Sequence, residues 1–346
     1  MTVEAIHTDA VIVGAGPVGL FQAFQLGLQD IRCHLIDALP HVGGQCVELY
    51  ADKPIYDIPG IPVCTGRELV MQLQTQVKPF APTVHLNQEV SEVVCMDDGL
   101  LSVRTSGHQH FICKTLFIAA GVGAFQARKL AVEGSVALEG THVHYHLGDA
   151  ARFANQDVLV LGGEESAVAA ALKLALQPHA PRSVTLMHRR DVFTADPALL
   201  QAMREAIASG KLQLQIGQLT ALLSTDHHLH TVQVATPDGN TIERRAQHVL
   251  AFLGLSPKLG PIANWGLAMD RKQLVVNTET FATDVPSIFA VGDINTYPGK
   301  KKLILCGFHE ATLAAFGAAA IVHPTRKTLL QYTTTSTELH RLLGIA

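Results

Sequence analysis

The stretch Ala10-Val11-Ile12-Val13-Gly14-Ala15-Gly16-Pro17-Val18-Gly19 decides the fold, because an apolar strand runs directly into a glycine-rich turn. A Gly-x-Gly-x-x-Gly turn between a strand and a helix is typical of sites for the pyrophosphate of a dinucleotide. Gly14 permits the tight turn, Gly16 lets the backbone approach the phosphates, and Gly19 lets the helix pack close to the strand. The stretch therefore predicts a Rossmann-like unit at the start of the chain.

The residues after the turn complete this unit, with a helix expected over 18–28 and a second strand over 32–37. Asp37 ends that strand about 20 residues beyond the turn, where a carboxylate can accept hydrogen bonds from a ribose hydroxyl. The same negative charge repels a 2′-phosphate. We therefore predict that this first site prefers FAD or NAD over NADP.

The end of the chain favours FAD at the first site. An apolar strand, Ile288-Phe289-Ala290-Val291, is followed by Gly292-Asp293. A carboxylate placed there can lie beside the ribityl hydroxyls of a flavin, and the alternative is a strand followed by an ordinary turn. We predict that Asp293 contacts FAD.

A second turn, Gly162-Gly163-Glu164-Glu165-Ser166-Ala167, follows the apolar run Val158–Leu161. Glu164 stands where the second glycine of the pattern is expected, and Ala167 takes the third position. A glutamate there would crowd and repel a pyrophosphate. The second site is therefore predicted as a dinucleotide site with an imperfect turn.

The strand predicted over 183–188 ends in His188-Arg189-Arg190, which indicates the nucleotide at the second site. Arginines there suit the 2′-phosphate of NADPH through charge and bidentate hydrogen bonds, the alternative being a solvated basic strand end. We predict NADPH as cosubstrate, with these contacts: Gly162, Gly163, Ser166, Arg189 and Arg190.

The two turns predict an α/β fold with two Rossmann-like dinucleotide-binding domains, the second inserted into the first. The expected boundaries are 1–118 and 249–346 for a discontinuous FAD-binding domain, and 119–248 for an NADPH-binding domain. The chain of 346 residues is long enough for both, and 48% of its residues are hydrophobic.

Composition excludes several classes of function. The net charge of −4 disfavours nucleic-acid binding. No apolar run is expected to reach the length of a membrane span, and no signal peptide is recognised, so we expect a cytoplasmic protein without a membrane partner. The histidines His142, His144 and His146 alternate along one predicted strand face, which we interpret as exposed rather than as a metal site.

The six cysteines contain neither redox pair that usually accompanies two such turns. Gly43-Gly44-Gln45-Cys46 resembles the start of a disulfide-reductase motif, but Ala51 occupies the position of the second cysteine. The segment 144–149, where thioredoxin reductases carry Cys-x-x-Cys, contains no cysteine. Electrons are therefore expected to leave by a route other than a dithiol.

With these motifs in place, the chain resembles the ferredoxin–NADP reductases of the thioredoxin-reductase-like type over essentially its whole length. Besides the two turns, the resemblance rests on Gly43-Gly44-Gln45 with Glu48-Leu49-Tyr50, Ile55–Gly60, Gly123-Ala124-Phe125 before Arg128-Lys129-Leu130, His188-Arg189-Arg190-Asp191, Leu259–Ile262 with Asn264–Leu267, Gly292-Asp293-Ile294 and Gly307-Phe308. It implies FAD contacts at Asp37, Gln45, Tyr50, Val90, Phe125, Asp293 and Thr334, in addition to Gly14, Gly16 and Gly19.

The resemblance also implies the chemistry. NADPH reduces the flavin, which passes single electrons to ferredoxin or flavodoxin, and no catalytic residue beyond the flavin is needed. It implies a homodimer in which the segment 332–335 reaches the flavin of the partner subunit. The run Lys300-Lys301-Lys302 is either a contact for an acidic ferredoxin or a solvated loop.

Other functions stay open at this level. One is an oxygen-reducing NAD(P)H oxidase, or a disulfide reductase that uses a lone cysteine. Another is a non-enzymatic FAD-binding protein whose second site Glu164 has disabled.

Overall fold

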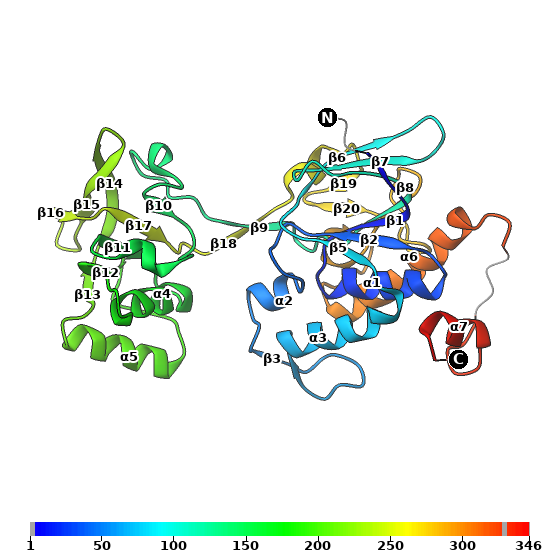
Figure 1. Cartoon of the computed structure of the whole chain (residues 1–346), viewed down its shortest axis with the longest axis horizontal. Coiled ribbons are helices and arrows are strands. Elements are labelled where there is room, and N and C mark those ends of the chain that lie inside the picture. Colours follow the sequence, from blue (N-terminus) through cyan, green and yellow to red (C-terminus); the bar gives the residue numbers. More distant parts are fainter. Residues whose placement is uncertain (1–3, 327–330, 346) are drawn as a thin grey trace. The chain divides into compact units, whose positions relative to one another are not determined.

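The computed structural model describes residues 4–326 and 331–345, apart from the side chains of 124–127 and 255–257. The chain forms two compact units, and the second is inserted into the first along the sequence, as predicted (Figure 1). This is the expected α/β fold with two Rossmann-like units.

The first unit comprises residues 1–124 and 257–346, and the second comprises residues 125–256. The two connecting segments, β9 (Ala124–Ala127) and β18 (Leu255–Lys258), pair as a two-stranded sheet.

The first unit is built on a sheet with the strand order β5-β2-β1-β8-β7-β6, in which β21 also pairs with β8. Strands β2, β1, β8 and β21 are parallel, and β6 and β7 add an antiparallel edge. The strands of this sheet are β1 (Ile6–Val13), β2 (Cys33–Ile36), β5 (Thr83–His85), β6 (Val90–Cys95), β7 (Leu101–Thr105), β8 (His110–Ile118) and β21 (Ile288–Ala290).

Helices α1 (Pro17–Leu28), α3 (Gly66–Val77) and α6 (Ile304–Val322) pack side by side on this sheet (Figure 1). Helix α3 begins with a complete capping box, in which Thr65 and Glu68 satisfy each other's main-chain N–H groups. The remaining elements of the unit are α2 (Gln45–Glu48), β3 (Pro54–Ile55), β4 (Cys64–Thr65), η1 (Lys78–Phe80), η4 (Gly260–Asn264), β19 (Met269–Asp270), β20 (Gln273–Val275), η5 (Gly292–Ile294), β22 (Asn295–Thr296) and α7 (Thr337–Leu343).

Among the described residues, one helix, α6, is by length and composition long enough and apolar enough to cross a membrane. The expectation that no apolar run approaches that length was therefore wrong. Its alanine-rich face, including Ala311, Ala314 and Ala318, is buried, and the helix packs on α1 and β8. Packing inside the first unit accounts for the apolar residues of this face.

The second unit contains a parallel sheet with the strand order β10-β17-β11-β12-β13 and an antiparallel sheet of β14, β15 and β16. Helix α4 contacts β11 and β12, and α5 packs on α4. Its elements are η2 (Val136–Leu138), β10 (Val143–His144), η3 (Ala150–Phe153), β11 (Asp157–Leu161), α4 (Glu165–Leu176), β12 (Ser183–His188), α5 (Pro197–Ala208), β13 (Gln213–Ile216), β14 (Gln218–Thr225), β15 (His228–Ala235), β16 (Thr241–Arg245) and β17 (His248–Ala251).

Both unit boundaries lie a few residues beyond the expected positions 118/119 and 248/249. Ala119 stays with the first unit because its N–H bonds to the carbonyl of Val13 at 2.8 Å. Strand β17 stays with the second unit because it pairs with β10 and β11. The first boundary, at 124/125, falls within the glycine-rich segment 119–125, a flexible stretch that suits a crossing between domains.

Candidate cofactor sites

The carboxyl ends of four strands meet at one edge of the first sheet. Val13 is in register with Ile36 and with Ile118, and Ile118 is in register with Ala290. The first glycine turn, Asp37 and the Gly292-Asp293 turn therefore follow strands that end side by side. In parallel α/β sheets this edge is where ligands bind.

Two glycines of the first turn are required by steric contacts. A Cβ on Gly14, whose φ is +107°, would lie 2.5 Å from the carbonyl oxygen of Ala119. A Cβ on Gly19 would lie 1.9 Å from the oxygen of Gly14. A Cβ on Gly16 would meet nothing closer than the Gly44 Cα at 3.9 Å, and no side chain caps α1. The turn therefore fits a pyrophosphate, which needs open space before free helix N–H groups.

Asp37 is almost completely buried beside this turn and bonds to it directly. Its carboxylate accepts hydrogen bonds from the N–H of Ala15 at 2.6 Å and from the N–H of Leu39 at 2.9 Å. Burial raises the pKa of Asp37, and these two N–H groups act in the opposite direction. Asp37 thus orders the turn, and each oxygen keeps a second lone pair for a ribose hydroxyl.

Gln45 begins α2 and Tyr50 follows this helix, on the segment that packs against the turn. The N–H of Gly43 bonds to the oxygen of Ala15 at 2.9 Å, and a Cβ on Gly44 would lie 3.1 Å from the Gly16 Cα. Close approach of these backbones places the side chain of Gln45 over Gly121.

Cys46 is buried and pairs with Tyr50, whose hydroxyl lies 3.4 Å from the cysteine sulfur. Burial raises the pKa of the Cys46 thiol. Reactive cysteines have lowered pKa values and are partly exposed. Burial and the raised pKa of Cys46 therefore argue against a disulfide reductase that uses this cysteine alone.

The other predicted FAD contacts are found in three settings. Val90 is buried at the start of β6, close to Asp37, whose carbonyl accepts from the N–H of Gln88 at 3.0 Å. The side chain of Phe125 lies outside the described residues. Thr334 is exposed and precedes α7, which contacts α1 and η1.

The lysine run contains a residue that the sequence misassigned. Lys300 is buried, and its ammonium pairs with Glu310, a wholly buried residue of α6. Lys300 is therefore neither solvated nor accessible to a partner, whereas Lys301 and Lys302 are exposed. An isolated glutamate within an apolar helix was the one sequence signal for this pair.

The second turn has the same backbone course with different contacts. Gly162, with φ +151°, would place a Cβ 2.4 Å from the oxygen of Phe252. Ala167 is fully buried where the first turn has Gly19. Glu164 is the N-cap of α4 with an ordinary φ of −98°, and its exposed side chain makes no capping bond.

The end of β12 lies beside this turn. The N–H of Gly162 bonds to the oxygen of Met187 at 3.0 Å, and the ring of His188 lies against Gly163. Arg189 and Arg190 follow directly and are exposed, as is Ser166 at the start of α4. The structure therefore brings the predicted NADPH contacts to one end of the second sheet.

Of the three histidines expected on one exposed strand face, His146 is exposed and His142 is half-buried. His144 is buried, and its Nε2 lies 3.2 Å from Nδ1 of His248 on β17. Burial lowers the pKa of both rings to about 4. Within the described residues, no group of three or more histidine, cysteine or acidic side chains is placed to hold a metal ion.

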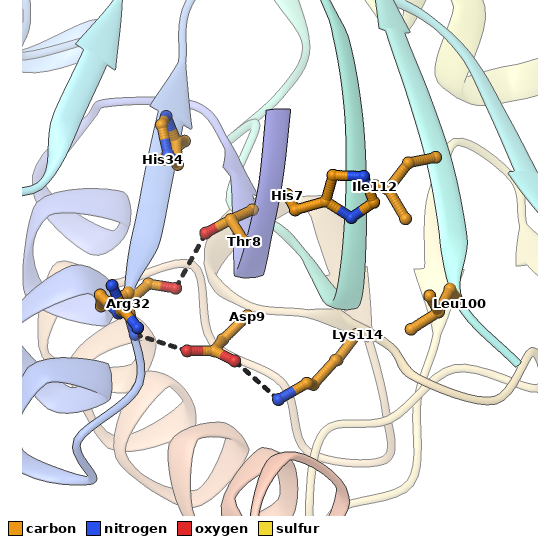
Figure 2. Close-up of a pocket in the computed structure, with 8 residues that line it drawn as sticks. All are labelled: His7, Thr8, Asp9, Arg32, His34, Leu100, Ile112 and Lys114. Carbon is orange, nitrogen blue, oxygen red and sulfur yellow. Dashed lines mark hydrogen bonds and ion pairs between the residues drawn. The ribbon is translucent and has the colours of Figure 1, made fainter. Parts of the chain in front are cut away.

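A separate pocket of about 330 Å³ lies at the opposite, amino-terminal edge of the first sheet (Figure 2). Asp9 and Lys114 form an ion pair of 2.8 Å in it. Its lining residues are His7, Thr8, Asp9, Arg32, His34, Leu100, Ile112 and Lys114. The pocket is distinct from the glycine turn, which lies at the other end of β1.

Comparisons with known proteins place the chain among redox enzymes. Residues 50–292 match the family described as "Pyridine nucleotide-disulphide oxidoreductase", and residues 12–66 match "NAD(P)-binding Rossmann-like domain". The chain is 53% identical to a ferredoxin–NADP reductase of Methylibium petroleiphilum, over 98% of this chain and 93% of that protein. It is also 53% identical to one of Albidiferax ferrireducens, over 99% of this chain and 97% of that protein.

Solved structures share the fold. Thioredoxin reductase of Lactococcus lactis matches with a TM-score of 0.58 and 25% identity, over 91% of this chain and 99% of that one. A bacillithiol disulfide reductase of Staphylococcus aureus matches with a TM-score of 0.61 and 20% identity, over 91% and 99%.

Proposed function

Because the chain belongs to the ferredoxin–NADP reductase family of the pyridine nucleotide-disulphide oxidoreductases, we propose that it carries electrons between NADPH and ferredoxin or flavodoxin. The observation that carries this proposal is similarity to ferredoxin–NADP reductases over nearly the full length of both chains. The cysteines support it, because Cys46 is a buried thiol of raised pKa.

The family uses FAD and NADP(H). Bound FAD supplies the chemistry, since it accepts a hydride from NADPH and can release electrons singly. The protein's own residues bind and orient the two nucleotides. The proposed FAD contacts are Gly14, Gly16, Gly19, Asp37, Gln45, Tyr50, Val90, Phe125, Asp293 and Thr334, and the proposed NADPH contacts are Gly162, Gly163, Ser166, Arg189 and Arg190.

A homodimer is part of the proposal, because α7, which follows Thr334, packs near the end of α1 that points away from the glycine turn. Arg326 forms an ion pair of 3.7 Å with Asp30, just after the end of α1, and lies 4.0 Å from Glu338 of α7. The turn lies at the other end of α1, about 18 Å away at 1.5 Å per residue. We therefore propose that Thr334 contacts the flavin of a second chain.

We propose the cytoplasm as the site of action. All six cysteines are free in the structure, which suits a reducing compartment.

Anaerobic stopped-flow reduction of the FAD-loaded protein by NADPH tests the function. We expect rapid bleaching of the flavin, slow reoxidation by oxygen, and cytochrome c reduction that depends on added ferredoxin or flavodoxin. Fast oxygen consumption would instead indicate an oxidase. A protein that binds FAD but is not bleached would be a flavin-binding protein with a disabled second site.

A further inference from the structure

A buried ion pair lies directly behind the turn that carries Asp293. Glu310 is wholly buried, and the Lys300 side chain is only 6% exposed. Burying two charges is costly, and replacing such a pair by apolar groups is often neutral or stabilising. Stability alone therefore gives a weak reason for this pair.

The contacts of Glu310 converge on one turn. Its Oε2 accepts from the N–H of Gly292 at 2.7 Å and from the amide of Asn295 at 2.8 Å. The Asn295 amide also donates to the carbonyl of Ala290 at 2.8 Å. The Glu310 carboxylate thus holds the end of β21 and the start of η5 together.

Lys300 binds the carbonyl side of Gly292, whose N–H is bound by Glu310. Its ammonium donates to the carbonyl of Gly292 at 2.9 Å and to Oε1 of Glu310. Tyr297 donates to that oxygen as well, at 2.9 Å, and burial together with this contact raises the pKa of Tyr297, so the hydroxyl keeps its proton. Both the N–H and the carbonyl of Gly292 are therefore bonded to the pair.

The φ of Gly292 is +82°, a conformation that glycine adopts readily, so the hydrogen bonds of the pair, and not steric restriction, fix this flexible residue. The next residue is Asp293, whose main-chain oxygen accepts from Gln273 at 3.3 Å. Among the described residues, no hydrogen bond holds the Asp293 carboxylate itself. Its position is therefore set by the backbone on which it stands.

We propose that Glu310 and Lys300 are positioning residues for the flavin site, which hold the Gly292 peptides so that the Asp293 carboxylate meets the ribityl chain of FAD. The inference rests on the proposed function, in which Asp293 contacts the flavin. Neither residue needs to touch the cofactor.

The test uses the double variant Glu310→Gln/Lys300→Met, which removes both charges and keeps an acceptor for the Gly292 N–H. Thermal unfolding of the apoprotein measures stability, and fluorescence titration with FAD measures the dissociation constant. We expect nearly unchanged unfolding and an FAD dissociation constant raised about tenfold, the effect of one lost charge-assisted hydrogen bond. The visible circular dichroism of the bound flavin should change as well.

A matched control is Asp9→Asn/Lys114→Met, which removes an ion pair of the same unit at the opposite edge of the sheet and should leave FAD affinity unchanged. Adding Asp293→Asn completes a cycle. If the pair acts through Asp293, the combined variant binds FAD no more weakly than the worse of the two parents. Additive losses, or an unchanged dissociation constant in the double variant, would overturn the inference.

Should the double variant not fold, Tyr297→Phe takes its place in the same cycle, since it removes one hydrogen bond to Glu310 and leaves the two charges paired. Failure of the proposed function is distinguishable from failure of this inference. Wild-type protein that does not bind FAD contradicts the function. Binding that Asp293→Asn weakens, while the pair variant leaves it intact, contradicts only the inference.

Discussion

The two glycine turns follow the same backbone course but tolerate different side chains. In the first, a methyl group on Gly19 would lie 1.9 Å from a main-chain oxygen, whereas the second buries Ala167 at the equivalent position. In the first, Asp37 bonds into the turn, whereas the second turn is packed against His188. The two turns thus differ sterically at the third position, which excludes a side chain in the first turn and accommodates a methyl group in the second.

The largest difference is expected for the third position of each turn. Gly19→Ala should destabilise the first unit by about 1–3 kcal/mol through overpacking and should abolish FAD binding. Ala167→Gly should cost only about 1 kcal/mol, as a glycine in a helix does. Denaturant unfolding and the FAD content of the purified variants check both. Wild-type stability and FAD content in Gly19→Ala would contradict the steric account.

The next effect concerns the basic end of β12. Arg189→Ala removes a charge-assisted contact to the 2′-phosphate, which should cost about 1.5–3 kcal/mol, or roughly 10- to 150-fold, in kcat/KM for NADPH. The kcat/KM for NADH should stay unchanged, so the ratio of kcat/KM for NADPH to that for NADH falls. Arg245→Ala, an exposed arginine of the same unit, serves as the control. If Arg189→Ala leaves the NADPH/NADH ratio of kcat/KM unchanged, Arg189 does not contact the 2′-phosphate.

At acid pH, each unit should lose stability through its own pair of histidines. The folded pKa of His144 and His248 is about 4, below the usual 6.5, so their contribution to stability is complete above pH 6.5 and is lost as the pH falls toward 4. His144→Asn should reduce this loss by on the order of 1 kcal/mol, because it no longer takes up a proton on unfolding.

Hydrogen exchange in β11 can follow the second unit, and fluorescence of Trp265, the one tryptophan, can follow the first. The acid transition of Trp265 should not change in His144→Asn. It should change in His85→Asn, because burial lowers the pKa of His85 and of its neighbour His34 in the first unit. Identical responses of both probes would mean that the units do not unfold separately.

The smallest effect is expected for Glu164. Its backbone conformation is ordinary, so glycine is not needed there, and only its charge and bulk remain to oppose a pyrophosphate. Glu164→Gly should tighten NADPH binding less than about tenfold, and the gain should shrink with salt, since the Debye length is about 10 Å at 0.1 M. The same substitution also removes a favourable charge at the N-terminus of α4, which destabilises the helix by about 0.3–1 kcal/mol and reduces the gain in NADPH affinity.

NADPH dissociation constants at two salt concentrations measure this, with Glu165→Gln as the neighbouring control. Equal affinities of wild type and Glu164→Gly at low salt would exclude repulsion. The second turn would then be an ordinary site despite its missing glycine.

The sequence by itself was sufficient for the two βαβ units, for their nesting and for the family. These depend on local patterns: an apolar strand, a glycine turn and an acidic or basic strand end, each within about 30 residues. Strand β12 begins and ends where the pattern predicts, at residues 183 and 188, because its hydrophobic run is local in the chain.

The burial and pairing of residues whose partners are distant in sequence could be read only from the folded structure. Lys300 looked like part of a solvated run until α6 brought Glu310 against it, and His144 looked exposed until β17 brought His248 beside it. The expectation that no apolar run reaches the length of a membrane span likewise missed helix α6, whose alanine face is buried in the first unit. Burial and pairing arise from the packing of separate elements, and a charge or a ring carries no mark of its partner in its own local sequence.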